Sequence, residues 1–176
     1  GSVGKTSTKE MLRACLSRLG PTHAPEKSFN NHWGVPLTLA RMPAASRYGV
    51  IEIGMNHAGE IRPLTRLARP HVAIVTMVGP VHIEFFSSEE AIADAKAEVF
   101  EGLEPDGVAI LNANNRHFAR LAAAAKATGA ARIIACGEAP DADARLVTMS
   151  ADAEGSDVGA TILGRDLRFR IGAPGA

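Results

Sequence analysis

Short apolar runs alternate with helix-like patterns along most of the chain. Continuous apolar runs predict buried strands at residues 49–53, 72–76, 108–111 and 132–135. Apolar positions spaced three and four residues apart predict helices near residues 5–19, 36–41, 61–68, 89–103 and 116–127. Strands that are apolar on both faces are typical of a parallel sheet covered by helices. The alternation therefore predicts a doubly wound α/β fold with a mostly parallel sheet flanked by helices.

The pattern changes near residue 137, where turn-forming residues become frequent. Residues 145–150, 158–163 and 167–171 have the pattern of short strands separated by Gly and Asp. We expect these strands to form a small antiparallel appendage near the C-terminus. Residues 172–176 have the composition of a turn or linker.

Composition narrows the class of protein. A chain of 176 residues is long enough for one domain with a sizeable core. Its 19 basic and 19 acidic side chains balance, so it lacks the basic excess that attracts nucleic acids or anionic membranes. No apolar run approaches the roughly 18 residues of a membrane span. The two cysteines, Cys15 and Cys136, lack a metal or disulfide spacing. We expect a cytoplasmic protein.

The first residues, GSVGKTS, end like a phosphate loop of the pattern G-x-x-x-x-G-K-[ST]. Glycines let backbone N–H groups surround phosphate oxygens, and the following helix turns its positive end toward them. Lys5 would add a charge, and the Thr6 hydroxyl would face Mg²⁺. The first glycine of the pattern and the strand before it would fall ahead of residue 1. Either the match is accidental or the chain is a piece of a longer protein.

Two polar side chains lie at, or just past, the carboxyl ends of predicted strands. Glu52 ends the strand at 49–53, and His82 follows the strand at 72–76. Ligands of open α/β sheets bind outside the carboxyl ends of the strands, where a carboxylate is the expected Mg²⁺ partner. Simpler interpretations remain open, because Glu52 fits a solvated strand end and a lone histidine is more often structural than a ligand.

Lys96 lies on the apolar face of the predicted helix at 89–103. A lysine in that position either extends along the apolar surface to solvent or serves a site, and periodicity alone favours the first. Two polar loops, at residues 30–36 and 55–60, offer amide and imidazole groups to a polar ligand. The same loops would be unremarkable as turns and helix caps.

Taken together, these stretches resemble the Mur ligase family of bacterial cell-wall synthesis. The matching segments, in family order, are GSVGKTSTKEM (1–11), FNNHWGVPLTLARM (29–42), VIEIGMNHAGEI (50–61), VGPVHIEFFSSEEAIADAKAEVFEGL (78–103) and GVAILNANN (107–115). The resemblance implies that residues 1–176 are the central ATP-binding domain, with a phosphate-loop type of fold. It further implies that this domain is truncated at both ends, and that an N-terminal UDP-substrate domain and a C-terminal domain are absent.

The resemblance also implies roles for individual residues. The implied catalytic residues are Lys5 on the ATP phosphates, His82 on the metal, and Lys96, which CO₂ converts to a carbamate in many family members. The implied metal ligands are Thr6, Glu52, His82 and Lys96. The implied ATP-binding residues are Gly1, Ser2, Val3, Gly4, Lys5, Thr6, Ser7, Asn31, Asn56, His57 and Asn112. The family often has aspartate where this chain has Asn114.

The implied activity is an ATP- and Mg²⁺-dependent peptide ligase that adds D-alanyl-D-alanine to UDP-N-acetylmuramoyl-tripeptide through an acyl phosphate. Residues 52–57 favour this member, because a sister ligase typically has a serine-rich E-x-S-S-H there. We expect the isolated domain to be inactive. The alternatives are a sibling Mur ligase, a folylpolyglutamate synthetase, a phosphate-loop phosphotransferase and a non-catalytic nucleotide-binding module. The last would leave the coincidence of Glu52, His82 and Lys96 unexplained.

Overall fold

Three parallel strands form the centre of the structure, a computed structural model that describes residues 1–81 and 83–172. They are β3 (Val72–Val75), β4 (Val108–Asn112) and β5 (Arg132–Gly137). β4 lies between the other two, with Ala109 level with Ala73 on one side and Ile133 on the other. The predicted α/β class and the mostly parallel sheet are confirmed.

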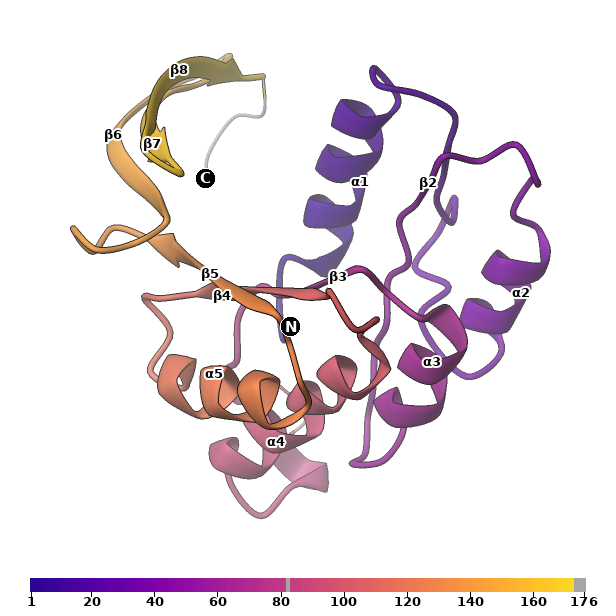
Figure 1. Ribbon diagram of the computed structural model, residues 1–176. Coiled ribbons are helices and arrows are strands. Elements are labelled where there is room, and N and C mark those ends of the chain that lie inside the picture. The colour runs from indigo at the N-terminus through magenta and orange to yellow at the C-terminus, as the bar shows by residue number, and fades with distance from the viewer. Residues whose placement is uncertain (82, 173–176) are drawn as a thin grey trace.

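The helices cover the two faces of this sheet unequally (Figure 1). One face carries α4 (Glu89–Ala97) and α5 (Phe118–Ala127), while α1 (Lys5–Leu16) lies over the other. The predicted helix at 89–103 begins at the Ser88 cap, whose hydroxyl accepts a hydrogen bond from the Ala91 N–H. After Ala97 it tightens into a 3₁₀ segment, η2 (Glu98–Gly102).

The apolar core lies between the sheet and the α4–α5 layer. Ala73, Val75, Ala109 and Leu111 alternate along β3 and β4 and are buried. They belong to one cluster with helix residues that include Ile92, Phe100 and Leu121. The intervening residues on the α1 side are only partly buried, so the two faces are not covered equally.

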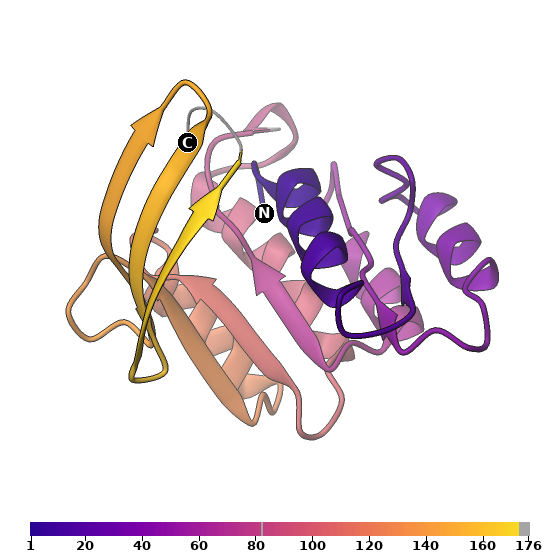
Figure 2. The same cartoon turned by 90° about the horizontal axis from the view of Figure 1, so that it is seen from above.

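The three C-terminal strands form an arm that continues the same sheet. The arm consists of β6 (Ala144–Asp152), β7 (Gly155–Ile162) and β8 (Arg165–Ile171), paired antiparallel in that order. β6 joins β5 through a short parallel pairing, so the sheet order is β3-β4-β5-β6-β7-β8. Figures 1 and 2 show the arm curving away from the parallel strands toward the α1 side. The predicted antiparallel appendage is confirmed as an extension of the main sheet.

The predicted strand at 49–53 is largely wrong. The observed strand β2 covers only Tyr48–Gly49 and pairs in parallel with β1 (Thr22–His23). Val50 still donates its N–H to the His23 carbonyl at 2.8 Å, but β1 ends there. Residues 51–53 therefore have no ladder partner within the described part of the chain, and Glu52 is held by side-chain contacts instead.

The remaining helices frame the region that follows these short strands. They are α2 (Gly34–Ala40) and α3 (Ile61–Ala68). The predicted helix at 5–19 ends earlier, at Leu16, where the backbone turns. Residues 173–176 of the predicted terminal turn lie outside the described residues. Within the described ranges, no helix combines the length and apolarity needed to cross a membrane.

Candidate active site around the phosphate loop

The phosphate loop begins α1 through a left-handed glycine. Gly4 has φ 79°, a conformation that glycine adopts without a side-chain penalty, and the helix starts at Lys5. The Lys5 ammonium folds back over the loop, donating to the Gly1 carbonyl at 2.8 Å and reaching the Ser2 carbonyl at 3.5 Å. The Lys5 ammonium is thus bound by backbone oxygens of the phosphate loop.

The loop is fastened to the segment that follows β3. The Ser2 N–H donates to the Met77 carbonyl at 2.6 Å, and the Ser2 hydroxyl is 3.0 Å from both the N and the O of Gly79. Thr76 donates its hydroxyl to the Val3 carbonyl at 2.6 Å. The Ser2 hydroxyl therefore holds the loop in place in this structure. Thr76 was not predicted as a site residue, although a threonine that ends an apolar strand is a signal in the sequence.

The approach of these two segments also requires glycine at position 1. A Cβ on Gly1 would lie 2.9 Å from the Met77 nitrogen, too close for a non-bonded contact, and closer still to the Thr76 hydroxyl. Loop and strand end therefore meet backbone against backbone. This contact brings the phosphate loop to the carboxyl end of β3, the edge at which ligands of α/β sheets bind.

Glu52 and Thr6 lie together, as the sequence predicted. The Glu52 carboxylate is only 5% exposed, and its Oε2 accepts a hydrogen bond from the Thr6 hydroxyl at 3.0 Å. Its Oε1 accepts a second from the Asn30 amide at 2.9 Å, which compensates part of the cost of burying the charge. A carboxylate beside a hydroxyl is an oxygen donor set that fits Mg²⁺. Asn30 belongs to the polar loop that the sequence places at the site, although its contact with Glu52 was not predicted.

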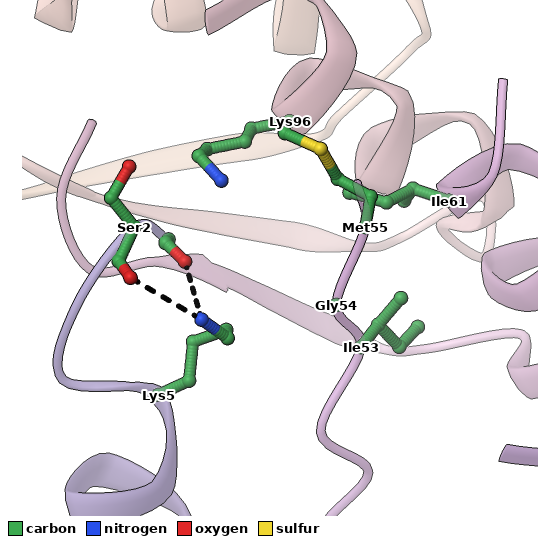
Figure 3. Close-up of a pocket in the computed structure, with 8 residues that line it drawn as sticks. Ser2, Lys5, Ile53, Gly54, Met55, Ile61 and Lys96 are labelled. Atoms are coloured by element: carbon green, nitrogen blue, oxygen red, sulfur yellow. Dashed lines mark hydrogen bonds between the residues drawn. The ribbon is translucent and has the colours of Figure 1, made fainter. Parts of the chain in front are cut away.

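Lys96 points inward, so its interpretation as a lysine that extends to the surface is wrong. It is 4% exposed and borders a cavity of about 20 Å³ beside the phosphate loop. The lining residues are Gly1, Ser2, Lys5, Ile53, Gly54, Met55, Ile61 and Lys96. Figure 3 shows Lys96 and Lys5 extending toward Ser2 from opposite sides. The cavity brings together three segments that are far apart in sequence.

The Lys96 amine has an unusual electrostatic setting. Burial, with a smaller contribution from the nearby Lys5 charge, lowers the pKa of Lys96 from 10.5 to about 8. No hydrogen bond or ion pair of Lys96 is found among the described residues. A buried ammonium without a partner is costly, so the neutral amine is favoured more than in an ordinary lysine.

The predicted residues of the two polar loops lie near this cavity but do not line it. Asn56 and His57 are exposed, and their backbone N–H groups donate to Glu60 at 2.7 and 3.2 Å. The Asn31 side-chain oxygen accepts from the N–H groups of Trp33 and Gly34 at the start of α2, at 3.1 and 2.9 Å. This contact favours the cap interpretation for Asn31.

Asn112 lies away from the Lys96 cavity. It ends β4 and lines a separate groove of about 510 Å³ between α1, the open sheet face and the arm, together with Thr8, Thr76 and Asn114. Its side-chain oxygen accepts a hydrogen bond from the Asn114 N–H at 2.9 Å. Ser7 is exposed in the first turn of α1.

The predicted metal ligands include two residues that contact each other, Glu52 and Thr6. His82 lies outside the described residues. No cluster of three or more His, Cys, Asp or Glu side chains that could hold a metal occurs in residues 1–81 and 83–172. Among the described residues, the Glu52 carboxylate and the Thr6 hydroxyl are the neighbouring oxygen donors that a metal could use.

Fold and site together define an α/β phosphate-loop domain with a buried carboxylate and a buried lysine beside the loop. Residues 1–176 match the Mur ligase middle domain, and the chain belongs to that family. It is 37% identical over 147 residues to the UDP-N-acetylmuramoyl-tripeptide–D-alanyl-D-alanine ligase of Rickettsia prowazekii (strain Madrid E), a match that covers 84% of this chain and 33% of the relative. It is 47% identical over 115 residues to the ligase of the same name from Escherichia coli (strain K12). That match covers 65% of this chain and 25% of the relative.

Solved structures that resemble this chain come from the same family. A crystal structure of MurF from Acinetobacter baumannii superimposes with a TM-score of 0.91 and 31% identity, covering 99% of this chain and 38% of that one. The described domain therefore has the fold of part of that protein. The chain spans about a third of the length of the relatives that it matches.

Proposed function

We propose that this domain belongs to an ATP-dependent ligase that joins D-alanyl-D-alanine to UDP-N-acetylmuramoyl-tripeptide in peptidoglycan precursor synthesis. The observation that carries the proposal is the convergence of the phosphate loop, the Glu52–Thr6 pair and the buried Lys96 around one site. The names of the relatives at 37% and 47% identity support it. We assign the recognition of both substrates mainly to other parts of the protein, and the reaction to the cytoplasm.

In the proposed reaction, the terminal carboxylate of the tripeptide attacks the γ-phosphate of ATP. A new O–P bond forms, the bond to ADP breaks, and an acyl phosphate results. The amine of D-alanyl-D-alanine then attacks the acyl carbon, a C–N bond forms, and phosphate leaves with the loss of an amine proton. Neither step needs a nucleophile from the protein, so catalysis depends on positioning and on charge neutralisation.

The residues of the phosphate loop would do the positioning. Backbone N–H groups of residues 1–7 and the Lys5 ammonium would hold the phosphates, with Lys5 leaving its present contacts on the Gly1 and Ser2 carbonyls. Asn112, Asn56 and His57 remain proposed ATP-binding residues at the edges of the site.

Glu52 and Thr6 would hold Mg²⁺, with His82 as a further proposed ligand. The ion supplies charge neutralisation for the phosphates when it is bound. The protein's own contribution is the orientation of the carboxylate. Asn30 fixes one Glu52 oxygen while Thr6 contacts the other, which limits rotation of the group.

We extend the proposal to a carbamate on Lys96. The neutral amine would attack CO₂, forming an N–C bond and releasing a proton. Burial favours this because it lowers the pKa of Lys96 to about 8 and leaves a fraction of the amine neutral near physiological pH. The carbamate is an anion, so the repulsion between the Lys96 and Lys5 ammonium groups would be replaced by attraction. Its oxygens resemble those of the carboxylates that bind Mg²⁺.

Phosphate release by the full-length protein tests the proposed reaction. The protein would be given ATP, Mg²⁺, UDP-N-acetylmuramoyl-tripeptide and D-alanyl-D-alanine, with each omitted in turn. We expect release only when all four are present. Release that ignores the dipeptide would indicate a phosphotransferase or a sibling ligase with another acceptor, and ATP binding without turnover would indicate a nucleotide-binding module.

A further inference from the structure

Glu98 is a further buried charged residue, two positions after Lys96, and no step of the proposed reaction uses it. Its carboxylate is 7% exposed at the start of η2. Its Oε1 accepts the Gly59 N–H at 2.6 Å, and its Oε2 accepts the Arg62 N–H at 3.1 Å. Glu98 thus contacts the chain where α3 begins, more than 35 residues earlier in the sequence.

These contacts explain why a carboxylate is tolerated in the interior. The first N–H groups of a helix lack partners within the helix and carry a partial positive charge. Glu60, at the start of α3, does not cap this helix with its side chain, and Glu98 does so from a distant segment. The Arg62 guanidinium, whose Nη2 is 3.9 Å from Oε1, adds a weaker attraction.

The segment that Glu98 holds is also a wall of the Lys96 cavity. Met55 and Ile61 line the cavity from one side, and the loop between them carries Asn56 and His57 (Figure 3). Glu98 contacts this segment at Gly59 and just beyond Ile61. Lys96 and Glu98 therefore lie on one short stretch of chain. Lys96 borders the cavity, and Glu98 binds the segment that contributes Met55 and Ile61 to the cavity wall.

We propose that Glu98 is a positioning residue that holds residues 55–61 against Lys96 and so keeps the cavity closed around the lysine. Without this contact, the start of α3 loses its cap and the Met55–Ile61 wall loses its attachment to the Lys96 segment. The inference rests on the proposed function, because the cavity matters to catalysis only if Lys96 does. A cap alone would affect stability, whereas a positioning residue also affects the chemical step.

The test compares Glu98→Gln and Glu98→Ala with Glu101→Gln in the full-length protein. Glutamine keeps the shape and one acceptor oxygen, so that variant remains informative if the alanine variant fails to fold. Glu101 is the matched control, because it also pairs with Arg62, at 2.8 Å, but through the arginine side chain and in a less buried position. Each protein is assayed for kcat and KM for ATP at a temperature well below its Tm. In bicarbonate-free buffer, acetylation of Lys96 by acetic anhydride is then followed by mass spectrometry.

We expect Glu98→Gln to lower kcat about tenfold while KM for ATP stays within about twofold, because the loss arises from misplacement near the reacting groups. Acetylation of Lys96 should become about threefold faster as the wall loosens and the amine becomes accessible. Glu101→Gln should match the wild type in both measurements. Wild-type kcat and wild-type labelling in Glu98→Gln, even with a lower Tm, would overturn the inference. If the proposed function is wrong, the wild type itself will lack phosphate release that depends on all four components. The labelling comparison remains valid in that case, because it does not depend on turnover.

Discussion

The region around the phosphate loop and the β6–β8 arm place their ionic contacts in different surroundings. Near the loop, Glu52 and Lys96 are almost completely buried, and Thr6 reaches Glu52 across 46 positions of sequence. In the arm, Arg170 pairs with Asp152 and Asp157 on the solvent side of adjacent strands. Charged groups near the phosphate loop are therefore buried, whereas the Arg170 ion pairs of the arm are exposed to water.

The difference separates residues kept for chemistry from residues kept for folding. Burying a charge costs free energy unless its partners compensate, so a buried lysine is poorly explained by stability alone. Exposed ion pairs contribute little to stability and are screened by salt. Substitutions near the phosphate loop should therefore change turnover more than stability. Substitutions in the arm should have little effect on turnover.

The largest effect is expected for Lys5→Ala in the full-length protein. The substitution removes the charge and the donor that would face the ATP phosphates, so kcat/KM for phosphate release should fall roughly 100-fold or more. Tm should change little, because Lys5 contacts only loop carbonyls in the absence of nucleotide. Lys126→Ala on the exposed side of α5 is the control. Undiminished turnover in Lys5→Ala would contradict the assignment of the loop.

A pH-dependent effect on stability is expected from Lys96. The pKa of Lys96 is about 8 in the folded protein and 10.5 when exposed, so between these values the unfolded chain binds more protons than the native one. The free energy of unfolding should therefore rise with pH from about 8 to 10.5, by an amount on the order of 3 kcal/mol. Lys96→Met should lose this contribution.

The measurement is chemical denaturation of both proteins from pH 7 to 10.5 in bicarbonate-free buffer. The stability of the wild type relative to Lys96→Met should rise over this range, because Met cannot titrate and other groups cancel in the difference. Lys126→Met, in which an exposed lysine is replaced, should show no such trend. A constant difference between wild type and Lys96→Met would mean that the lysine is solvated in solution.

The sequence was sufficient where local patterns determine the outcome. Apolar periodicity located β3–β5 and four of the helices to within a few residues, because apolar positions recur in them at strand or helix spacing. Thr6 and Glu52 were also predicted to share one site and are in contact, although residues 51–53 do not form the strand on which the Glu52 prediction rested. In these cases neighbouring residues carry the information.

Local sequence patterns were insufficient to predict the structure where contacts with a distant segment determine it. The apolar run at 49–53 reads as a full strand, yet a ladder needs a partner and β1 supplies only two residues. Lys96 is ambiguous in sequence because a long side chain can leave an apolar face, and it is the packing of Met55 and Ile61 that encloses it. Asn30 and Asn31 are chemically identical neighbours, and only the turn before α2 decides which one reaches Glu52.

The smallest effect is expected for Arg170→Ala in the arm. Arg170 donates to Asp152 and Asp157 at 2.7 and 2.8 Å, but all three side chains are well exposed. Its removal should lower Tm by no more than a few degrees and leave turnover within about twofold of wild type.

The Arg170 guanidinium, followed by backbone N–H groups, lowers the pKa of Asp152. The Tm difference should therefore be present above the ordinary Asp pKa of 3.8 and shrink as the pH falls below it. Arg168→Ala, two positions earlier on β8 and without an ion pair among the described residues, is the control. A large loss of turnover in Arg170→Ala at unchanged Tm would break the comparison, because it would place a functional contact in the arm.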